Sequence, residues 1–193
     1  YYLFGENMDV VKRNPKLEVF KEKGFEVLLL TDPVDLFTIT FITDYEEKPL
    51  KSIEKADLDF DDEEKKDEPE TTEADKSLIE MFKETLGDKV EDVQPAKRLV
   101  DSAAVLVVGK EGMDVHMERM MKMVNEQFEG HKKILELNLR HPLLKNIAGL
   151  KEQGAERERI DLFINQIYEG AVLLDGNMTN PADVTVEIIA DVP

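Results

Sequence analysis

The sequence predicts an α/β segment followed by an α+β segment. The first is a small three-stranded α/β subdomain, and the second is a mixed sheet with helices that ends in a dimerising helical bundle. Three observations support this: short apolar runs flank a helical pattern at the start, strands and amphipathic helices are mixed later, and an acidic stretch divides the two. We therefore expect an α/β subdomain over 1–55, an acidic linker over 56–75 and a dimerisation domain over 76–193.

Composition narrows the class of protein. The chain has 193 residues, of which 41% are hydrophobic, as in globular proteins. Its apolar runs are much shorter than the roughly 20 residues that a membrane helix needs, so we expect no membrane partner. The absence of cysteine rules out disulfides and thiolate chemistry in this sequence. A net charge of −18 argues against nucleic acid as a partner, because phosphate binding needs clustered cations.

The first segment reads as a parallel βαβ unit. Residues 1–4 (YYLF) and 25–30 (FEVLLL) are predicted strands, and the residues between them carry a helical apolar pattern. Residues 49–53 are a candidate third strand. Asp32 and Pro33 form a helix-start signal, but the residues after them (VDLFTITFIT) alternate and are β-branched. Propensity alone leaves helix and strand both open there.

The acidic stretch over residues 54–75 holds twelve acids and three lysines, a net charge of −9. Such a composition cannot bury enough apolar surface to fold alone, so it predicts a linker. It also contains part of a calcium-loop pattern, but the turn glycine of that pattern is replaced by Asp62. We therefore expect no calcium site on its candidate ligands, which are Asp57, Asp59, Asp61 and Glu68.

The last segment alternates strands and helices. Strands are predicted over 92–100, 103–108 and 132–139, and helices over 76–86, from Pro142, and over 156–174. Asn180 and Pro181 signal a final helix, although the alternation that follows them also fits a strand. The apolar faces of the last two helices favour pairing with a second copy of the chain. The predicted dimer interface consists of Ile160, Phe163, Ile164, Ile167, Ala171, Leu174, Val184, Ile188 and Ile189.

Five of the eight methionines lie in residues 112–128 (GMDVHMERMMKMVNEQF). Their spacing predicts one stripe on a helix. Such a stripe fits a core, but the flexible thioether also suits a surface that adapts to differently shaped partners. The stripe consists of Met113, Met117, Met120, Met121, Val124 and Phe128.

A search for catalytic chemistry finds little. Phosphate-loop, dinucleotide-binding and serine-elbow motifs are absent from the sequence. His116, His131 and His141 do not form a compact metal-ligand set, and His141 before Pro142 is better placed to cap a helix. We expect no catalytic residue and no metal ligand in this sequence.

Several stretches, in order along the chain, resemble the heat-shock protein 90 chaperone family. These are KLEVFKEKGFEVLLLTDPVD, AKRLVDSAAVLVV, GMDVHMERMMK, KKILELN and DLFINQIYEGAVLLDGNMTNP. They are similar to the end of that family's middle domain and to its C-terminal dimerisation domain. The resemblance implies that residues 34–43 form a helix.

The resemblance also implies a function. The family hydrolyses ATP with magnesium in an N-terminal domain that this sequence does not contain, so we expect no cofactor and no enzyme activity in this stretch. The sequence does not end in the acidic tail of the eukaryotic cytosolic members, which implies a bacterial, cytoplasmic stress-response chaperone, with an organelle form of the family as the alternative. Implied partners are a second copy of the chain, unfolded or partly folded client proteins, and other chaperones.

The resemblance places the expected client-binding residues in both segments. Phe37 matches a position that is commonly tryptophan in bacterial members, and Leu36 matches an acid, so a charge is lost there. The expected client-binding residues are Phe37, Met113, Met117, Met120, Met121 and Val124. The alternatives are an α/β enzyme domain of unknown substrate and a passive dimeric adaptor.

Overall fold

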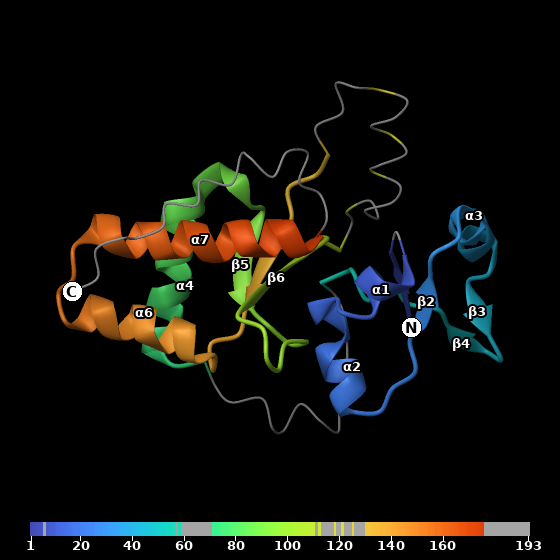
Figure 1. Cartoon of the computed structure of the whole chain (residues 1–193), viewed down its shortest axis with the longest axis horizontal. Coiled ribbons are helices and arrows are strands. Elements are labelled where there is room, and N and C mark those ends of the chain that lie inside the picture. Colours follow the sequence, from blue (N-terminus) through green and yellow to red (C-terminus); the bar gives the residue numbers. More distant parts are fainter. Residues whose placement is uncertain are drawn as a thin grey trace.

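The computed structural model describes residues 1–5, 7–56, 58, 71–110, 112, 118, 121, 125 and 130–175. Figure 1 shows two groups of elements side by side, one built from residues up to 58 and one from residues 71 onward. We call the described residues of these ranges the first unit and the second unit. Helices and short sheets are mixed in both, which confirms the mixed α and β class predicted from the sequence.

The first unit begins with the predicted parallel βαβ arrangement. Strand β1 (Tyr2–Phe4) pairs in parallel with β2 (Leu28–Leu30), which confirms that prediction. The connection contains α1 (Met8–Val11), a 3-10 turn η1 (Pro15–Leu17) and α2 (Glu18–Glu22). The helical pattern is interrupted at Pro15, because proline lacks the N–H needed to continue α1.

The predicted third strand is present only as a bridge. Ser52 forms an isolated parallel bridge with Tyr2, on the side of β1 opposite β2. An antiparallel hairpin of β3 (Asp44–Tyr45) and β4 (Lys48–Pro49) precedes it. Its turn residues Glu46 and Glu47 both have positive φ, a conformation that Asn and Gly normally supply. The hairpin was therefore not predicted.

The ambiguous stretch after Asp32 is a helix, α3 (Pro33–Phe41). Asp32 accepts a hydrogen bond from the Val34 N–H at 3.0 Å, and Asp35 accepts one from the Asp32 N–H at 3.2 Å. This capping box and the proline at the first turn outweigh the strand preference of the β-branched residues. The helix implied by the family resemblance is confirmed.

The second unit is a mixed three-stranded sheet with helices packed against it. Its elements are α4 (Glu73–Leu86), a 3-10 turn η3 (Gly87–Lys89), β5 (Asp92–Pro95), β6 (Ala104–Val107), β7 (Ile134–Leu137), α6 (Pro142–Glu152) and α7 (Arg157–Asp175). The strand order is β5-β7-β6, with β5 parallel and β6 antiparallel to β7. Helix α4 ends at Gly87, as predicted, where a positive φ of 48° favours glycine.

The core of the second unit lies between the sheet and helices α4, α6 and α7. Phe82, Leu135 and Ile164 are completely buried there, one each from a helix, the central strand and the long helix. Helix α7 contacts β6, α4 and α6, so it closes the core along its length (Figure 1). No helix among the described residues is both long and apolar enough to span a membrane.

Much of the predicted acidic linker lies outside the described residues, including the calcium-loop pattern. Its described ends belong to ordered elements. Helix α4 begins at Glu73, where Thr72 and Asp75 form a capping box, and Leu58 is buried in the core of the first unit. Gly176, Asn180 and Pro181 also lie outside the described residues, so the predicted helical bundle is not shown.

Candidate interaction surfaces

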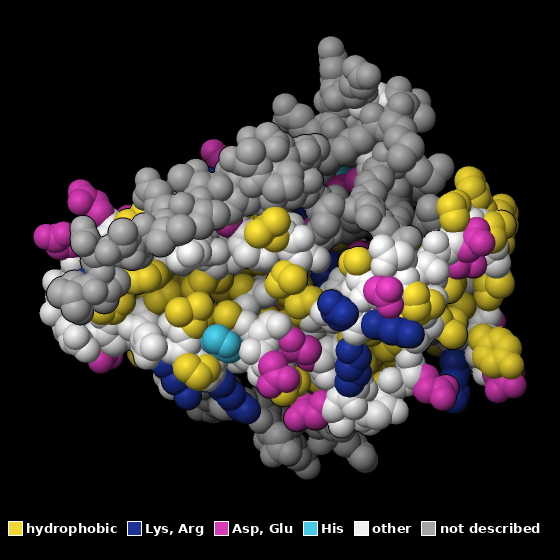
Figure 2. Space-filling model, in the orientation of Figure 1, with side chains coloured by type: hydrophobic (Ala, Val, Ile, Leu, Met, Phe, Trp, Pro, Cys, Tyr) yellow, Lys and Arg dark blue, Asp and Glu magenta, His cyan; other side chains and the backbone are white. Residues whose placement is uncertain are grey.

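Helix α3 and the residues that follow it carry a group of exposed apolar side chains, which we call the α3 surface. It consists of Val34, Phe37, Phe41, Ile42 and Tyr45. Phe37 is 57% exposed and Phe41 is 85% exposed. Figure 2 shows hydrophobic side chains gathered at this end of the molecule, over α3 and the β3–β4 hairpin. Contiguous exposed apolar surface of this kind marks an interaction site in soluble proteins.

The local sequence explains why these side chains face outward. The capping box fixes where the helix begins, and Thr38 donates a side-chain hydrogen bond to the Val34 carbonyl at 3.0 Å. These polar contacts stabilise the helix on which Phe37 and Phe41 are exposed. Phe37 is thus accessible, as a client-binding residue must be.

The methionine stretch is described at only a few positions. Met121 is 41% exposed, and its carbonyl accepts a hydrogen bond from the Asn125 N–H at 2.7 Å, the spacing of a helical turn. Glu118 is buried and accepts from the His131 backbone N–H at 2.8 Å. Gly130 has a positive φ, which directs His131 back toward Glu118. The other predicted client residues of this stretch, Met113, Met117, Met120 and Val124, lie outside the described residues.

The predicted dimer face of α7 divides into two sets. Ile160, Ile164, Ile167 and Ala171 are buried in the chain's own core. Phe163 is partly buried and Leu174 is 55% exposed, and both line an apolar groove of about 280 Å³ that also contacts Leu143 and the start of β6. Ile167 and Ala171 also line this groove, so the two sets meet there, and Leu174 is the most exposed residue of the predicted face among those described. Val184, Ile188 and Ile189 lie outside the described residues.

His141 has the structural role predicted for it. Its Nδ1 accepts a hydrogen bond from the Leu143 N–H at 3.2 Å, which caps the start of α6. His131 lies beside Glu118, and His116 is outside the described residues. Within the described residues, no cluster of His, Asp or Glu is arranged to hold a metal ion.

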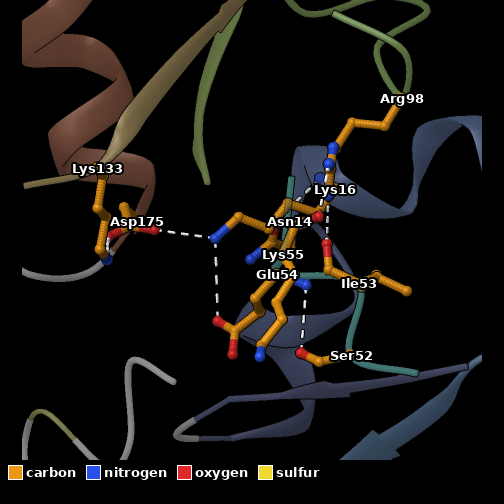
Figure 3. A network of polar contacts seen from close by, with 9 residues as sticks. All are labelled: Asn14, Lys16, Ser52, Ile53, Glu54, Lys55, Arg98, Lys133 and Asp175. Atoms are coloured by element: carbon orange, nitrogen blue, oxygen red, sulfur yellow. Dashed lines mark hydrogen bonds and ion pairs between the residues drawn. The ribbon is translucent and has the colours of Figure 1, made fainter. Parts of the chain in front are cut away.

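Buried charges join the two units, and sequence reasoning did not single them out (Figure 3). Lys16, which is 2% exposed, donates to Asp175 at 2.9 Å, and Lys133 donates to the other oxygen of Asp175 at 2.5 Å. Glu54 lies 3.9 Å from the Lys16 ammonium. Burial alone would raise the pKa of Asp175, but the two lysines outweigh it and hold that pKa below its usual range.

Arg98 forms the second buried contact between the units. Its Nε and Nη2 donate to both oxygens of Glu136, at 2.8 and 3.0 Å. Its Nη1 and Nη2 also donate to the carbonyls of Ile53 and Lys55, in the first unit, at 2.5 and 2.8 Å. Glu136 interrupts the apolar strand ILEL, all four residues of which are buried, and such an interruption is the signal that could have revealed the pair.

The chain matches the Hsp90 protein family over residues 1–191. It belongs to the Hsp90 family. This confirms the resemblance to the family that was found in the sequence. It also confirms the expectation that the family is one of chaperones linked to the stress response. The match does not assign the chain to a particular part of an Hsp90 protein.

Curated bacterial relatives support the same conclusion. The chain is 46% identical over 182 residues to "Chaperone protein HtpG" of Chlorobium phaeobacteroides, covering 92% of this chain and 29% of that protein. It is 41% identical to the protein of the same name from Chlorobaculum tepidum, covering 95% and 30%, and 38% identical to that of Alkalilimnicola ehrlichii, covering 94% and 28%. The chain therefore spans less than a third of the length of these relatives.

One expectation needs correction. The sequence predicted no enzyme activity in this stretch, although full-length members of the family hydrolyse ATP, yet its relatives are HtpG proteins and belong to a family of ATPase chaperones. The prediction rested on motifs sought within a stretch that corresponds to about 29% of those relatives. The prediction of no enzyme activity is therefore contradicted at the level of the family.

Proposed function

We propose that this chain is the client-binding and dimerising part of an ATP-driven Hsp90 chaperone of the bacterial cytoplasm. The observation that carries the proposal is the α3 surface, where Phe37 and Phe41 are exposed on a capped helix. ATP and magnesium bind in a part of the protein outside this chain. The bacterial origin of the relatives and their chaperone names agree with this function.

The α3 surface suits unfolded or partly folded clients for a physical reason. Such clients expose apolar side chains, and removing apolar surface from water contributes about 25 cal/mol per Å². The α3 surface offers aromatic and aliphatic contact area, and such contacts do not require one particular client sequence. This area comes from the two phenylalanines and from Val34, Ile42 and Tyr45. Met113, Met117, Met120, Met121 and Val124 form the second part of the client site, and the half-exposed thioether of Met121 supports this.

Dimerisation uses the accessible edge of α7 together with residues beyond it. Leu174 and Phe163 line an open apolar groove, and a second copy of the chain is the occupant expected for the Hsp90 family. Ile160, Ile164, Ile167 and Ala171 then support the interface from within the core. Val184, Ile188 and Ile189 complete the proposed interface.

The proposed division of the chain is an α/β subdomain over 1–55, a linker over 56–75 and a dimerisation domain over 76–193.

Client binding is tested with the double variant Phe37→Ser and Phe41→Ser. The measurement is light scattering of a chemically denatured test protein diluted into buffer with and without the chain. We expect the variant to suppress aggregation less than the parent, whereas Leu162→Ser, a change at an exposed apolar residue of α7, should behave like the parent. A double variant that is folded and protects the test protein as well as the parent would refute the client role of α3.

Dimerisation is tested with Leu174→Asp, which places a charge in the open groove while leaving the buried face of α7 unchanged. Sedimentation at low micromolar concentration should show a dimer for the parent and for Leu162→Asp, and a monomer for Leu174→Asp. A dimer that forms normally but does not protect clients would instead favour the passive adaptor.

A further inference from the structure

The two units have separate hydrophobic cores. The core of the first unit contains Leu3 and Phe20, that of the second contains Phe82 and Leu135, and no residue belongs to both. A small third cluster of Val105, Val107 and Ile134 meets Ala56 and Leu99 near the junction. The described contacts between the units are otherwise largely hydrogen bonds and ion pairs. Interfaces of this polar type permit relative motion of domains.

Glu18 makes the most convergent of these polar contacts. Its Oε2 accepts hydrogen bonds from the backbone N–H groups of Val100, Asp101 and Ser102, at 2.7, 2.9 and 3.1 Å. Its Oε1 accepts from the Ser102 hydroxyl at 2.5 Å. The donors belong to the second unit, 82 to 84 residues further along the chain. Successive backbone N–H groups that point at one oxygen form an anion-binding concavity, or nest.

The chemistry of this contact favours the ionised carboxylate. Burial alone would raise the pKa of Glu18, but the Ser102 hydroxyl and the three backbone N–H groups outweigh it and lower that pKa. A contact that needs the charge is lost when the carboxylate is removed, and another carboxylate can replace it. The nearby Val19 N–H donates to the Arg98 carbonyl at 3.1 Å, so α2 is held against this turn at two points.

Glu18 differs from the buried contacts in its access to solvent. Arg98 and Glu136 are almost fully enclosed, so their pair cannot exchange with solutes. Val100 and Asp101 are exposed and Glu18 is half-buried, so water and small anions reach the nest. Exchange is therefore possible at Glu18 without unfolding either core.

We propose that the turn Val100–Ser102 is a carboxylate-binding site, and that Glu18 fills it as a releasable latch between the two units. When Glu18 leaves, the units separate at this edge and the nest accepts another carboxylate. This inference concerns the arrangement of the units within one chain and does not depend on the client surface, although Ser102 also lines the apolar groove proposed for dimerisation.

The latch is tested by distance measurement in the Glu18→Ala variant. The chain has no cysteine, so cysteines introduced at the exposed Lys12 and Glu158 can carry donor and acceptor dyes on the two units. We expect the fraction of molecules with separated units to rise about tenfold or more, because the variant loses a set of hydrogen bonds to a charged group. Glu22→Ala, an exposed change on the same helix, should leave the distance unchanged.

Chemical rescue distinguishes a specific site from a general loss of charge. In Glu18→Ala, acetate added at constant ionic strength should bind in the nest and accept hydrogen bonds from the N–H groups that Glu18 has left. The measurement is a saturable shift of the amide resonances of Val100–Ser102. Acetamide, which is neutral and of similar size, should give no such shift. The same acetate titration should leave the parent protein unchanged, because Glu18 already occupies the nest.

Two results would overturn the proposal. An unchanged distance in Glu18→Ala would overturn the latch, and amide shifts that are equal for acetate and acetamide would overturn the carboxylate site. Ser102→Ala removes one donor while leaving α2 and the three backbone donors in place. It should move the distance in the same direction by a smaller amount, and no movement in this variant would also count against the latch.

Discussion

Helices α3 and α7 both carry apolar residues that the sequence assigned to partners, but the structure places them differently. The stripe of α7 is used by the chain itself, with Ile164 completely buried between the sheet and α4. Phe37 of α3, the residue assigned to clients, is 57% exposed. Apolar periodicity thus predicts that a helical face will be covered, but it does not predict by what.

The difference follows from what each helix has beside it. Helix α7 is 19 residues long and lies against β6, α4 and α6, so its apolar face meets other apolar faces. Helix α3 is nine residues long and is stabilised by its cap and by internal hydrogen bonds. A helix stabilised by its ends can leave its apolar side chains available to a partner.

The largest effect is expected for Ile164→Asp. A buried, unpaired carboxylate in the core of the second unit should lower the free energy of unfolding by about 5 kcal/mol. Leu162→Asp, on the accessible side of the same helix, should change it by about 0.5 kcal/mol or less. Urea unfolding followed by circular dichroism measures both. If Ile164→Asp stayed as stable as the parent and lost only dimerisation, the contrast between α7 and α3 would disappear.

The next effect is expected for Arg98→Leu, which leaves Glu136 and two carbonyls buried without their donor. Breaking a buried pair from one side costs about 3–4 kcal/mol. The double variant Arg98→Leu and Glu136→Leu should regain part of this loss, because no charge stays buried. Lys97→Leu, at the exposed neighbouring position, is the control. A single variant as stable as the control would show that the pair contributes nothing to the fold.

A smaller effect is expected from acid at Asp175. Its pKa in the folded chain lies below the ordinary value of about 3.8, so its ionised form stabilises the fold above that pH. This stabilisation should be lost as the pH falls through the folded pKa. Asp175→Asn should therefore be less stable than the parent at pH 7, by less than the Arg98 change because Glu54 still lies beside Lys16. The difference in the free energy of unfolding between the parent and Asp175→Asn should become smaller below pH 3.8. A constant difference down to acidic pH would contradict this.

The smallest effect on stability is expected for Phe41→Ser. Because the side chain is exposed, the free energy of unfolding should change by about 0.5 kcal/mol or less. Phe20→Ser, in the core of the same unit, should cost about 3–5 kcal/mol. Thermal unfolding compares the two. A loss at Phe41 close to that at Phe20 would mean that α3 packs against the chain in solution.

Local signals predicted much of the fold. The strands around β1 and β2 follow from apolar runs, and the end of α4 follows from Gly87. The cap at His141 follows from the proline after it. Such features depend on residues that are neighbours in sequence, so the sequence contains the information directly.

Features that depend on distant residues were harder to predict. Lys16 and Arg98 occur in ordinary polar contexts, and only the fold shows that their charges are buried against Asp175 and Glu136. The helix at α3 required the family resemblance, since propensity and capping disagreed there. The exposure of Phe37 was likewise suggested by resemblance, and the apolar pattern alone could not have separated it from the core.

The pairing of Lys16 with Asp175 has a consequence for synthesis of the protein. The two residues are 159 positions apart, so a ribosome adding roughly 5–20 residues per second makes the aspartate on the order of 10 to 30 seconds after the lysine. During that interval Lys16 can pair with Glu54 at 3.9 Å but lacks its 2.9 Å contact with Asp175, so full burial of the ammonium is less favourable. The first unit is then expected to keep this side open on the ribosome until the end of α7 has emerged. An apolar residue at position 16 would allow the first unit to bury this side early, before the residues of α7 that it contacts have been synthesised.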